Sequence, residues 1–198
     1  MSATEAASQT SVALDDEERR ALLDLARASI RHGLETGRAL KPDLHDLPPR
    51  LRADGGTFVT LKKHGELRGC IGTLEPYQPL AADVAEHAFD AAFRDPRFPP
   101  LAAPEYDDLE IDISILGAPA EMTFADETDL VAQLLPGVDG LILQEGVRRG
   151  TFLPSVWEQL PDPADFLRHL KIKAGLPPDY WSDTLRVWRY EVEYVTEE

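Results

Sequence analysis

The sequence predicts an α+β fold in which an antiparallel β-sheet is flanked by helices. Residues 57–74 and 141–153 each have the pattern of a β-hairpin, with β-branched or aromatic residues on both sides of a glycine-containing turn. Residues 109–115 alternate strictly between apolar and polar side chains, which is typical of a half-buried strand. Helical segments lie between these strands without regular β-α-β alternation, and this order favours an antiparallel sheet covered by helices.

The helices are predicted from apolar spacing and from the residues that begin or end them. Asp15 and Glu18 have the spacing of a capping box, and an apolar stripe at helical spacing follows them as far as Leu34. A second stripe follows Pro79 and ends at Phe93, shortly before another proline. The sequence further predicts short helices at residues 126–135, 155–160 and 163–174, and a terminal strand at residues 184–195.

Composition and charge exclude several classes of function. The chain has 36 acidic and 20 basic residues, and its net charge of -16 opposes any sequence-independent binding to nucleic-acid phosphates. No apolar stretch approaches the roughly 18 to 20 residues that cross a bilayer. A lone cysteine cannot form an intrachain disulfide, and residues 1–13 lack the pattern of a secretion signal. We therefore expect a cytoplasmic protein with a flexible tail at 1–13 and a single domain at 14–198.

The second arm of the first hairpin carries the candidate chemistry. It reads Leu67-Arg68-Gly69-Cys70-Ile71-Gly72, and two glycines in one strand suggest a bulge or a close approach of another backbone. A thiolate is the reactive form of cysteine, and nearby cations favour it. Arg68 would share a strand face with Cys70, while basic residues at 62–64 cluster at the turn. We therefore predict Cys70 as a nucleophile or redox thiol, with Arg68 stabilising its charge or orienting an anionic substrate, and Gly69 and Gly72 leaving room for that substrate.

Two other interpretations of these residues stay open. Cysteine often behaves as a small buried hydrophobe, and paired glycines often serve tight packing alone. The protein could then be a non-catalytic module that binds a peptide or a protein partner, for example along an exposed edge strand at 186–194. Glu110 and Asp112 project from one strand face as paired acids might, but their spacing does not distinguish catalysis from ordinary solvation, and we favour solvation. For Trp157 and the other large aromatic residues of the second half we expect packing.

No cofactor or metal is predicted. No glycine loop that could cradle a phosphate precedes a helix, which removes the usual nucleotide-binding fingerprints. The histidines lack the close spacing with cysteine or with one another that metal-binding helices use; they are His32, His45, His64, His87 and His169.

Several strings of the sequence resemble the AMMECR domain in the expected order. They are residues 67–72 (LRGCIG), 97–101 (RFPPL), 111–116 (IDISIL) and the block 140–181, which contains Arg149, Thr151 and the string 173–177 (KAGLP). The resemblance covers residues 15–195. It implies an α+β fold with a larger sheet-and-helix lobe, a smaller lobe and a cleft between them.

The resemblance also directs attention to particular residues and partners. It places the family motif on Arg68, Gly69, Cys70 and Gly72, and we expect Arg149, with Thr151, to complete an anion-binding site. Prokaryotic members are also called AmmeMemoRadiSam system protein A, because they are encoded near a Memo-like protein and a radical S-adenosylmethionine protein. This implies a shared pathway with those two partners, without assigning a reaction.

Overall fold

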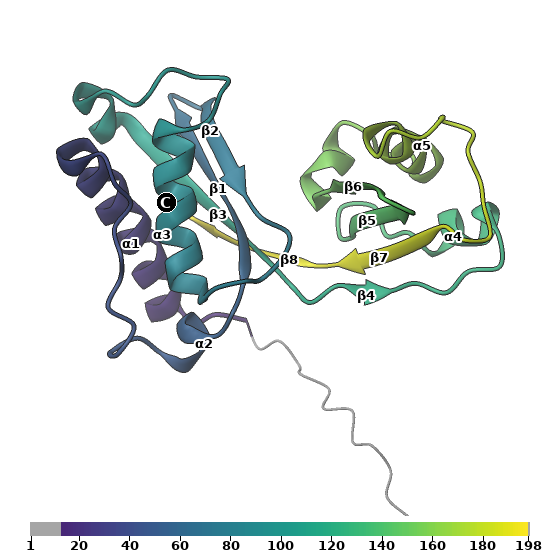
Figure 1. The fold of residues 1–198 in the computed structure, drawn as a ribbon, viewed down its shortest axis with the longest axis horizontal. Helices are drawn as coiled ribbons and strands as arrows, with labels where there is room; N and C mark the ends of the chain where they lie inside the picture. The colour runs from purple at the N-terminus through teal and green to yellow at the C-terminus, as the bar shows by residue number, and fades with distance from the viewer. Residues whose placement is uncertain (1–12, 198) are drawn as a thin grey trace, which may run out of the picture. The chain divides into compact units, whose positions relative to one another are not determined.

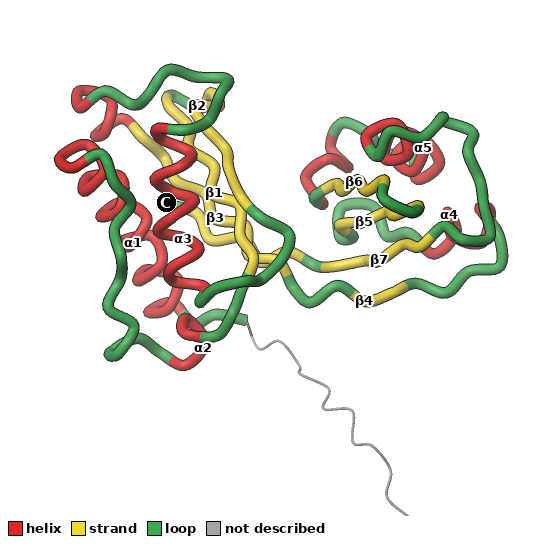
Figure 2. The backbone as a smooth tube through the Cα atoms, viewed as in Figure 1, coloured by secondary structure: helices red, strands yellow, loops and turns green. Residues whose placement is uncertain are grey.

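The computed structural model describes residues 13–197, so the predicted tail lies outside the described residues except for Ala13. The chain forms two compact units. The first contains the residues up to Ser114 together with the segment from Val195, and the second is Ile115–Tyr194. Each unit has its own four-stranded sheet (Figures 1 and 2). None of the helices within residues 13–197 has the length and apolar character needed to span a membrane.

The first unit is a sheet with helices on one face. Its elements are α1 (Asp16–Thr36), α2 (Pro49–Arg52), β1 (Gly56–Lys63), β2 (Glu66–Gly72), α3 (Leu80–Phe93), the 3-10 helix η1 (Ala103–Asp108), β3 (Leu109–Leu116) and β8 (Val192–Thr196). The strand order is β2-β1-β3-β8, so β2 and β8 are the two edges. Helix α3 packs on β1 and β2, and α1 packs on α3 (Figure 1).

Local sequence explains these elements. Asp15 caps α1, accepting a hydrogen bond from the backbone N–H of Glu18, whose carboxylate accepts one in return. Alternate residues of β1 and β3, such as Val59 and Ile111, are fully buried beneath the helices. Half of the buried residues of α3 are alanines, whose small side chains let the helix backbone approach its neighbours closely.

The second unit has its own core. Its elements are β4 (Ala120–Glu121), α4 (Glu127–Gln133), β5 (Gly140–Glu145), β6 (Arg148–Phe152), the 3-10 helix η2 (Pro154–Glu158), α5 (Pro163–Lys173) and β7 (Arg186–Tyr190), with the strand order β4-β7-β5-β6. The predicted packing of the aromatic residues is confirmed for Trp157 and Phe166, whose rings stack 3.7 Å apart at the centre of this core.

The α+β class, both hairpins and the alternating strand are confirmed, and the strands form two four-stranded sheets. One detail of the prediction is wrong. The predicted terminal strand is two strands, since β7 lies between β4 and β5 in the second sheet while β8 joins the first. Residues 186–190 are therefore not an exposed edge. Alternation predicts that a segment is a strand, but it does not identify the strand's partners.

Candidate functional site: the Cys70 strand

Cys70 lies on edge strand β2 and faces away from the helices. Its neighbour Gly69 points at α3, because a Cβ built there would meet the carbonyl oxygen of Ala91 at 2.1 Å. Successive strand residues point to opposite faces, so the Cys70 side chain projects from the other face, where neither α1 nor α3 lies (Figure 1). The side chain is half-buried, and the Thr60 hydroxyl of β1 donates a hydrogen bond to its Sγ at 3.3 Å.

The backbone of Cys70 is held from outside the sheet by the loop that follows α3. The buried carboxylate of Asp95 accepts a hydrogen bond from the Cys70 N–H at 2.9 Å. Arg97 donates through Nη2 to the Cys70 carbonyl oxygen at 3.3 Å. Both backbone groups of Cys70 thus find partners away from β1, and Asp95 and Arg97 take the place of a neighbouring strand at this position.

Asp95 and Arg97 also bind each other. The Arg97 side chain donates from Nε to Oδ1 at 3.0 Å and from Nη2 to Oδ2 at 2.6 Å, and its backbone N–H donates to Oδ1 at 3.0 Å. These bonds, with the one from the Cys70 N–H, hold the pKa of the Asp95 carboxyl well below its usual range despite its burial. The Cys70 backbone is therefore held by an ion pair.

Arg68 occupies a different environment from the one predicted. It is the extra residue of a β-bulge, because Leu61 pairs with Gly69 while Lys62 pairs with Leu67. Its guanidinium donates to both carboxylate oxygens of Glu105 at 3.1 Å and to the Pro99 carbonyl oxygen at 3.0 Å. The expected sharing of a strand face with Cys70 is wrong, because the bulge interrupts the alternation. Arg68 directs its hydrogen bonds to η1 and the loop before it.

The basic residues at the hairpin turn are also paired with acids. Lys63 lies 3.3 Å from the Glu105 carboxylate that binds Arg68, and these hydrogen bonds, chiefly those from Arg68, lower the pKa of Glu105 to about 2. Lys62 lies 2.5 Å from Asp112, so one of the two acids proposed as a pair on β3 is engaged in an ion pair. The turn therefore has little unbalanced charge to offer Cys70.

The two glycines of the motif are explained by packing. Gly69 fits against the α3 backbone, and a Cβ at Gly72 would lie 2.3 Å from the Thr57 carbonyl oxygen and 2.4 Å from the Phe58 ring. The predicted bulge and close approach are both confirmed. The space that we expected to admit a substrate is filled by the protein itself at both positions, so that interpretation is corrected.

The two remaining predicted site residues lie in the second unit. Arg149 and Thr151 share strand β6, where Thr151 donates to the Leu141 carbonyl oxygen at 2.8 Å and lies 3.1 Å from the Tyr190 hydroxyl. Thr151 therefore has a local role in joining β6, β5 and β7. A meeting of Arg149 with Cys70 stays a prediction.

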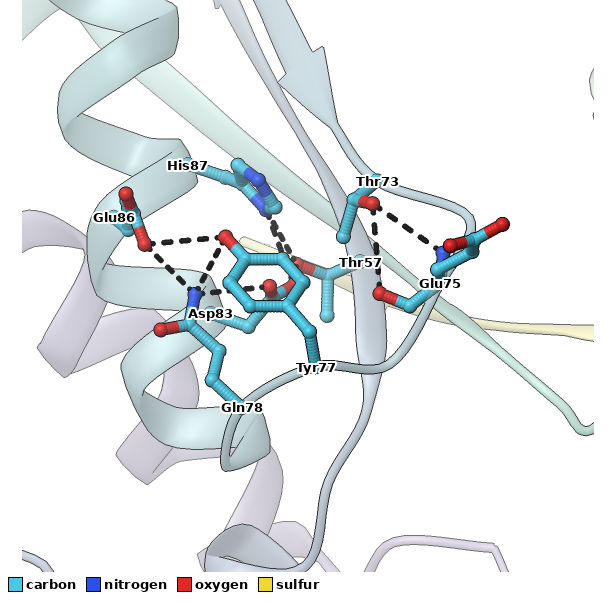
Figure 3. Close-up of polar contacts among 8 residues, drawn as sticks. All are labelled: Thr57, Thr73, Glu75, Tyr77, Gln78, Asp83, Glu86 and His87. Carbon is cyan, nitrogen blue, oxygen red and sulfur yellow. Dashed lines mark hydrogen bonds and ion pairs between the residues drawn. The ribbon is translucent and has the colours of Figure 1, made fainter.

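A buried polar network on the helix side of the sheet was not predicted as a functional feature (Figure 3). The Asp83 carboxylate accepts from the Thr57 hydroxyl at 2.7 Å and lies 3.1 Å from His87 Nδ1. Its other oxygen accepts from Gln78 at 3.2 Å, and Gln78 also donates to Glu86 at 2.8 Å. Asp83 and His87 stand four residues apart on α3, which is the sequence signal that could have found the pair.

The outer part of the network lies at the start of α3. The Tyr77 hydroxyl donates to Glu86 at 3.2 Å, and burial followed by the nearby carboxylates raises the pKa of Tyr77 to about 12. Thr73 and Glu75 close a separate turn just after β2 (Figure 3). The network joins β1, the 73–79 loop and α3, so it supports the hairpin that carries Cys70 from its other face.

The described residues offer no ready metal centre. Among residues 13–197, no group of three or more histidine, cysteine, aspartate or glutamate side chains is arranged to hold a metal ion. A hollow of about 910 Å³ does exist beside the network in the first unit. It is lined by Gln78 and Glu86 together with basic residues that include Arg38, Lys41 and Arg94.

Comparison with known proteins shows close relatives along almost the whole chain. A model of the AMMECR1 family matches residues 23–195. A protein of Methanothermobacter thermautotrophicus is 40% identical over 188 residues, covering 93% of this chain and 97% of that protein. Protein MK0488 of Methanopyrus kandleri is 40% identical over 189 residues, covering 92% and 89%. The crystal structure of the uncharacterized protein PH0010 from Pyrococcus horikoshii is similar with a TM-score of 0.82 and 35% identity, covering 91% and 92% of the two chains.

Proposed function

The chain belongs to the AMMECR1 family, and on this premise we propose that it processes or modifies a small molecule through the thiol of Cys70. The observation that carries the proposal is the setting of that thiol. Cys70 is half-buried on the sheet face opposite the helices, and hydrogen bonds fix both of its backbone groups. A cysteine that served only as a small hydrophobe would more commonly be sealed in the core.

Preorganisation supports this proposal. Reactive groups need a supporting shell that locks their position, because small displacements cost much of the rate. Here the buried carboxylate of Asp95 and the guanidinium of Arg97 bind the N–H and the carbonyl oxygen of Cys70, and so hold its main chain in place. The Thr60 hydroxyl donates to the sulfur itself and would stabilise the ionised form during reaction.

The alternative function, a module that binds a peptide or a protein without chemistry, loses part of its support. It was expected to use residues 186–194 as a free strand edge. Within that range β7 is enclosed between two strands of the second sheet, and only residues 192–194 lie on an edge strand, β8. A pathway shared with Memo-like and radical S-adenosylmethionine proteins stays a prediction from the family resemblance.

Alkylation of the sole cysteine tests the proposal. The rate of carbamidomethylation by iodoacetamide, followed by intact mass, is compared between native protein and protein in denaturant at one pH. We expect the native rate to stay within about tenfold of the unfolded rate, and Cys70→Ser should not be labelled at all. A Cys70 that stays unlabelled until the protein unfolds would remove the reactive-thiol function.

A second comparison addresses the hydroxyl beside the sulfur. Thr60→Val keeps the shape of the side chain and removes the donor, so we expect a native alkylation rate several-fold below that of the parent protein, consistent with loss of one hydrogen bond of about 1 kcal/mol. The matched control is Thr36→Val. The Thr36 hydroxyl donates to an exposed backbone carbonyl of α1, so removing it should leave the alkylation rate unchanged.

A further inference from the structure

We propose that Arg97 binds the anionic group of the molecule that reacts at Cys70, and that this molecule is a small carboxylate. The inference rests on the proposed function and names its substrate class. It transfers to Arg97 the anion-orienting role that sequence reasoning gave to Arg68.

The position of the Arg97 guanidinium is fixed beside Cys70. Two of its nitrogens bind the Asp95 carboxylate, which also binds the Cys70 N–H, and Nη2 reaches the Cys70 carbonyl oxygen. A long, flexible side chain is thereby held in one orientation without a ligand. The side chain of Arg97 already loses its conformational entropy when the protein folds. Binding of a ligand would therefore not carry that cost.

Arg97 still has donors to offer. A guanidinium carries five N–H groups, and those of Nε and Nη2 serve Asp95 and Cys70. Nη1 makes no hydrogen bond to any described residue, and the side chain is 52% exposed. The Phe98 ring, 5.5 Å away, stacks against the guanidinium and leaves its edge available. The N–H groups of a guanidinium are charge-assisted donors, which make short, strong hydrogen bonds to carboxylate oxygens, and Nη1 can supply them here.

Arg68 cannot play this part, although it stands closer in sequence. Its side chain is only 11% exposed, and both oxygens of Glu105 already bind its guanidinium. Its remaining nitrogen, Nη1, is buried without a hydrogen-bond partner and is inaccessible to a solute. Of the two arginines joined to the Cys70 strand, only Arg97 faces solvent.

The local charge favours an anion where the whole protein does not. The charged residues that join the strand to its surroundings are three cations, Lys63, Arg68 and Arg97, and two anions, Asp95 and Glu105. Arg97 is balanced by Asp95, whereas Lys63 and Arg68 share the single carboxylate of Glu105, so the five residues together carry one net positive charge in a chain of net charge -16. The hydrogen bonds to Asp95 are the main cause that raises the pKa of Arg97. A local cation in an anionic protein concentrates small anions at one place.

Two reagents of equal size test the inference. Iodoacetate carries a carboxylate and iodoacetamide is neutral, and each forms a thioether S–C bond at Cys70 while iodide leaves and the thiol proton passes to solvent. The ratio of their alkylation rates cancels the intrinsic reactivity of the thiol. We expect Arg97→Gln to lower the iodoacetate-to-iodoacetamide ratio about tenfold, the factor that corresponds to loss of one charge-assisted hydrogen bond.

The matched control is Arg94→Gln, which removes the same charge from an arginine paired with Asp90 on the surface of α3. It should leave the ratio near that of the parent protein. Arg97→Lys, which keeps the charge and loses the planar donors, should fall between the two. Equal ratios in Arg97→Gln and Arg94→Gln would overturn the inference, whereas a native Cys70 inert to both reagents would overturn the proposed function instead.

A measurement on the unaltered protein guards against misfolding of the variant. Succinate should slow alkylation by iodoacetamide in a saturable manner when compared with sodium chloride at equal ionic strength. If succinate and chloride act alike, Arg97 does not hold a carboxylate at this site and the inference fails.

Discussion

Gly69 shows how closely a single residue can be fitted to its surroundings. The Ala91 carbonyl oxygen occupies the position that a side chain would need, and it belongs to the backbone of a helix that cannot easily retreat. We expect Gly69→Ala to lower the free energy of unfolding by about 3 kcal/mol, at the upper end of the usual cost of overpacking. Urea unfolding followed by circular dichroism measures this.

Gly65, at the turn of the same hairpin, provides the control for that substitution. Its φ of 78° is unfavourable for other residues, but a Cβ there would meet nothing within 4 Å. Gly65→Ala should therefore cost only about 1 kcal/mol, from backbone strain alone. Equal losses at the two glycines would contradict the argument from close packing.

The Arg68–Glu105 pair should make stability depend on pH. The folded pKa of Glu105, about 2, lies below its ordinary value of 4.5, so its contribution is complete above pH 4.5 and is lost as the pH falls toward 2. At pH 7 we expect Glu105→Gln to cost about 3 kcal/mol, because it leaves the buried Arg68 charge unpaired. Chemical denaturation at a series of pH values should show the parent and variant converging in acid. Parallel curves would refute this account, and Glu121→Gln, which breaks the exposed pair with Arg186, should have a much smaller effect.

Some features of the site could be predicted from the sequence because they depend on local spacing, and others could not because they depend on distant residues. The sequence identified Cys70 and predicted a bulge in its strand, and Arg68 does stand two residues before it. The direction in which the Arg68 side chain points depends on which residue of β2 is the extra one in the bulge. The pairing of β2 with β1 determines that residue. Asp95 and Arg97 bind the backbone of Cys70 from 25 and 27 positions further along the chain. The periodicity of a sequence carries no information about contacts at such a separation.

At the scale of elements, α3 and β1 are joined by a buried hydrogen bond as well as by apolar contact. Thr57 is fully buried, and its hydroxyl donates to Asp83. We expect Thr57→Val, which keeps the shape of the side chain, to lower stability by about 1–3 kcal/mol, because a buried carboxylate loses a donor. Guanidinium unfolding measures it, and a variant as stable as the parent would show that the network contributes little.

Predicting the elements was easier than predicting their partners. Apolar periodicity and capping residues identified α1, α3, β3 and both hairpins almost to the residue, because these signals are local. The two-residue strand β4 carries too few residues for any pattern. The division of residues 184–195 between two sheets depends on a break near Glu191, and the sequence there remains rich in β-forming residues.

At the scale of the whole molecule, each compact unit should respond by itself to damage in its own core. Phe166 is fully buried between Trp157 and Phe152 in the second unit. We expect Phe166→Ala to destabilise that unit by about 3–5 kcal/mol and to speed amide hydrogen exchange in peptides from residues 140–190. Peptides from α1 and β1 should keep their parent rates. Equal acceleration in both sets would show that the two units unfold as one.

The position of β8 has a consequence for biosynthesis. This strand completes the first sheet beside β3, yet the ribosome reaches it only after translating the entire second unit. The nascent chain must therefore expose the unpaired edge of β3 while residues 117–191 emerge. Until Glu197 arrives to receive Arg27 and the Ile111 N–H, that edge is open to mispairing with other chains, and this protein should depend on chaperones more during synthesis than after it.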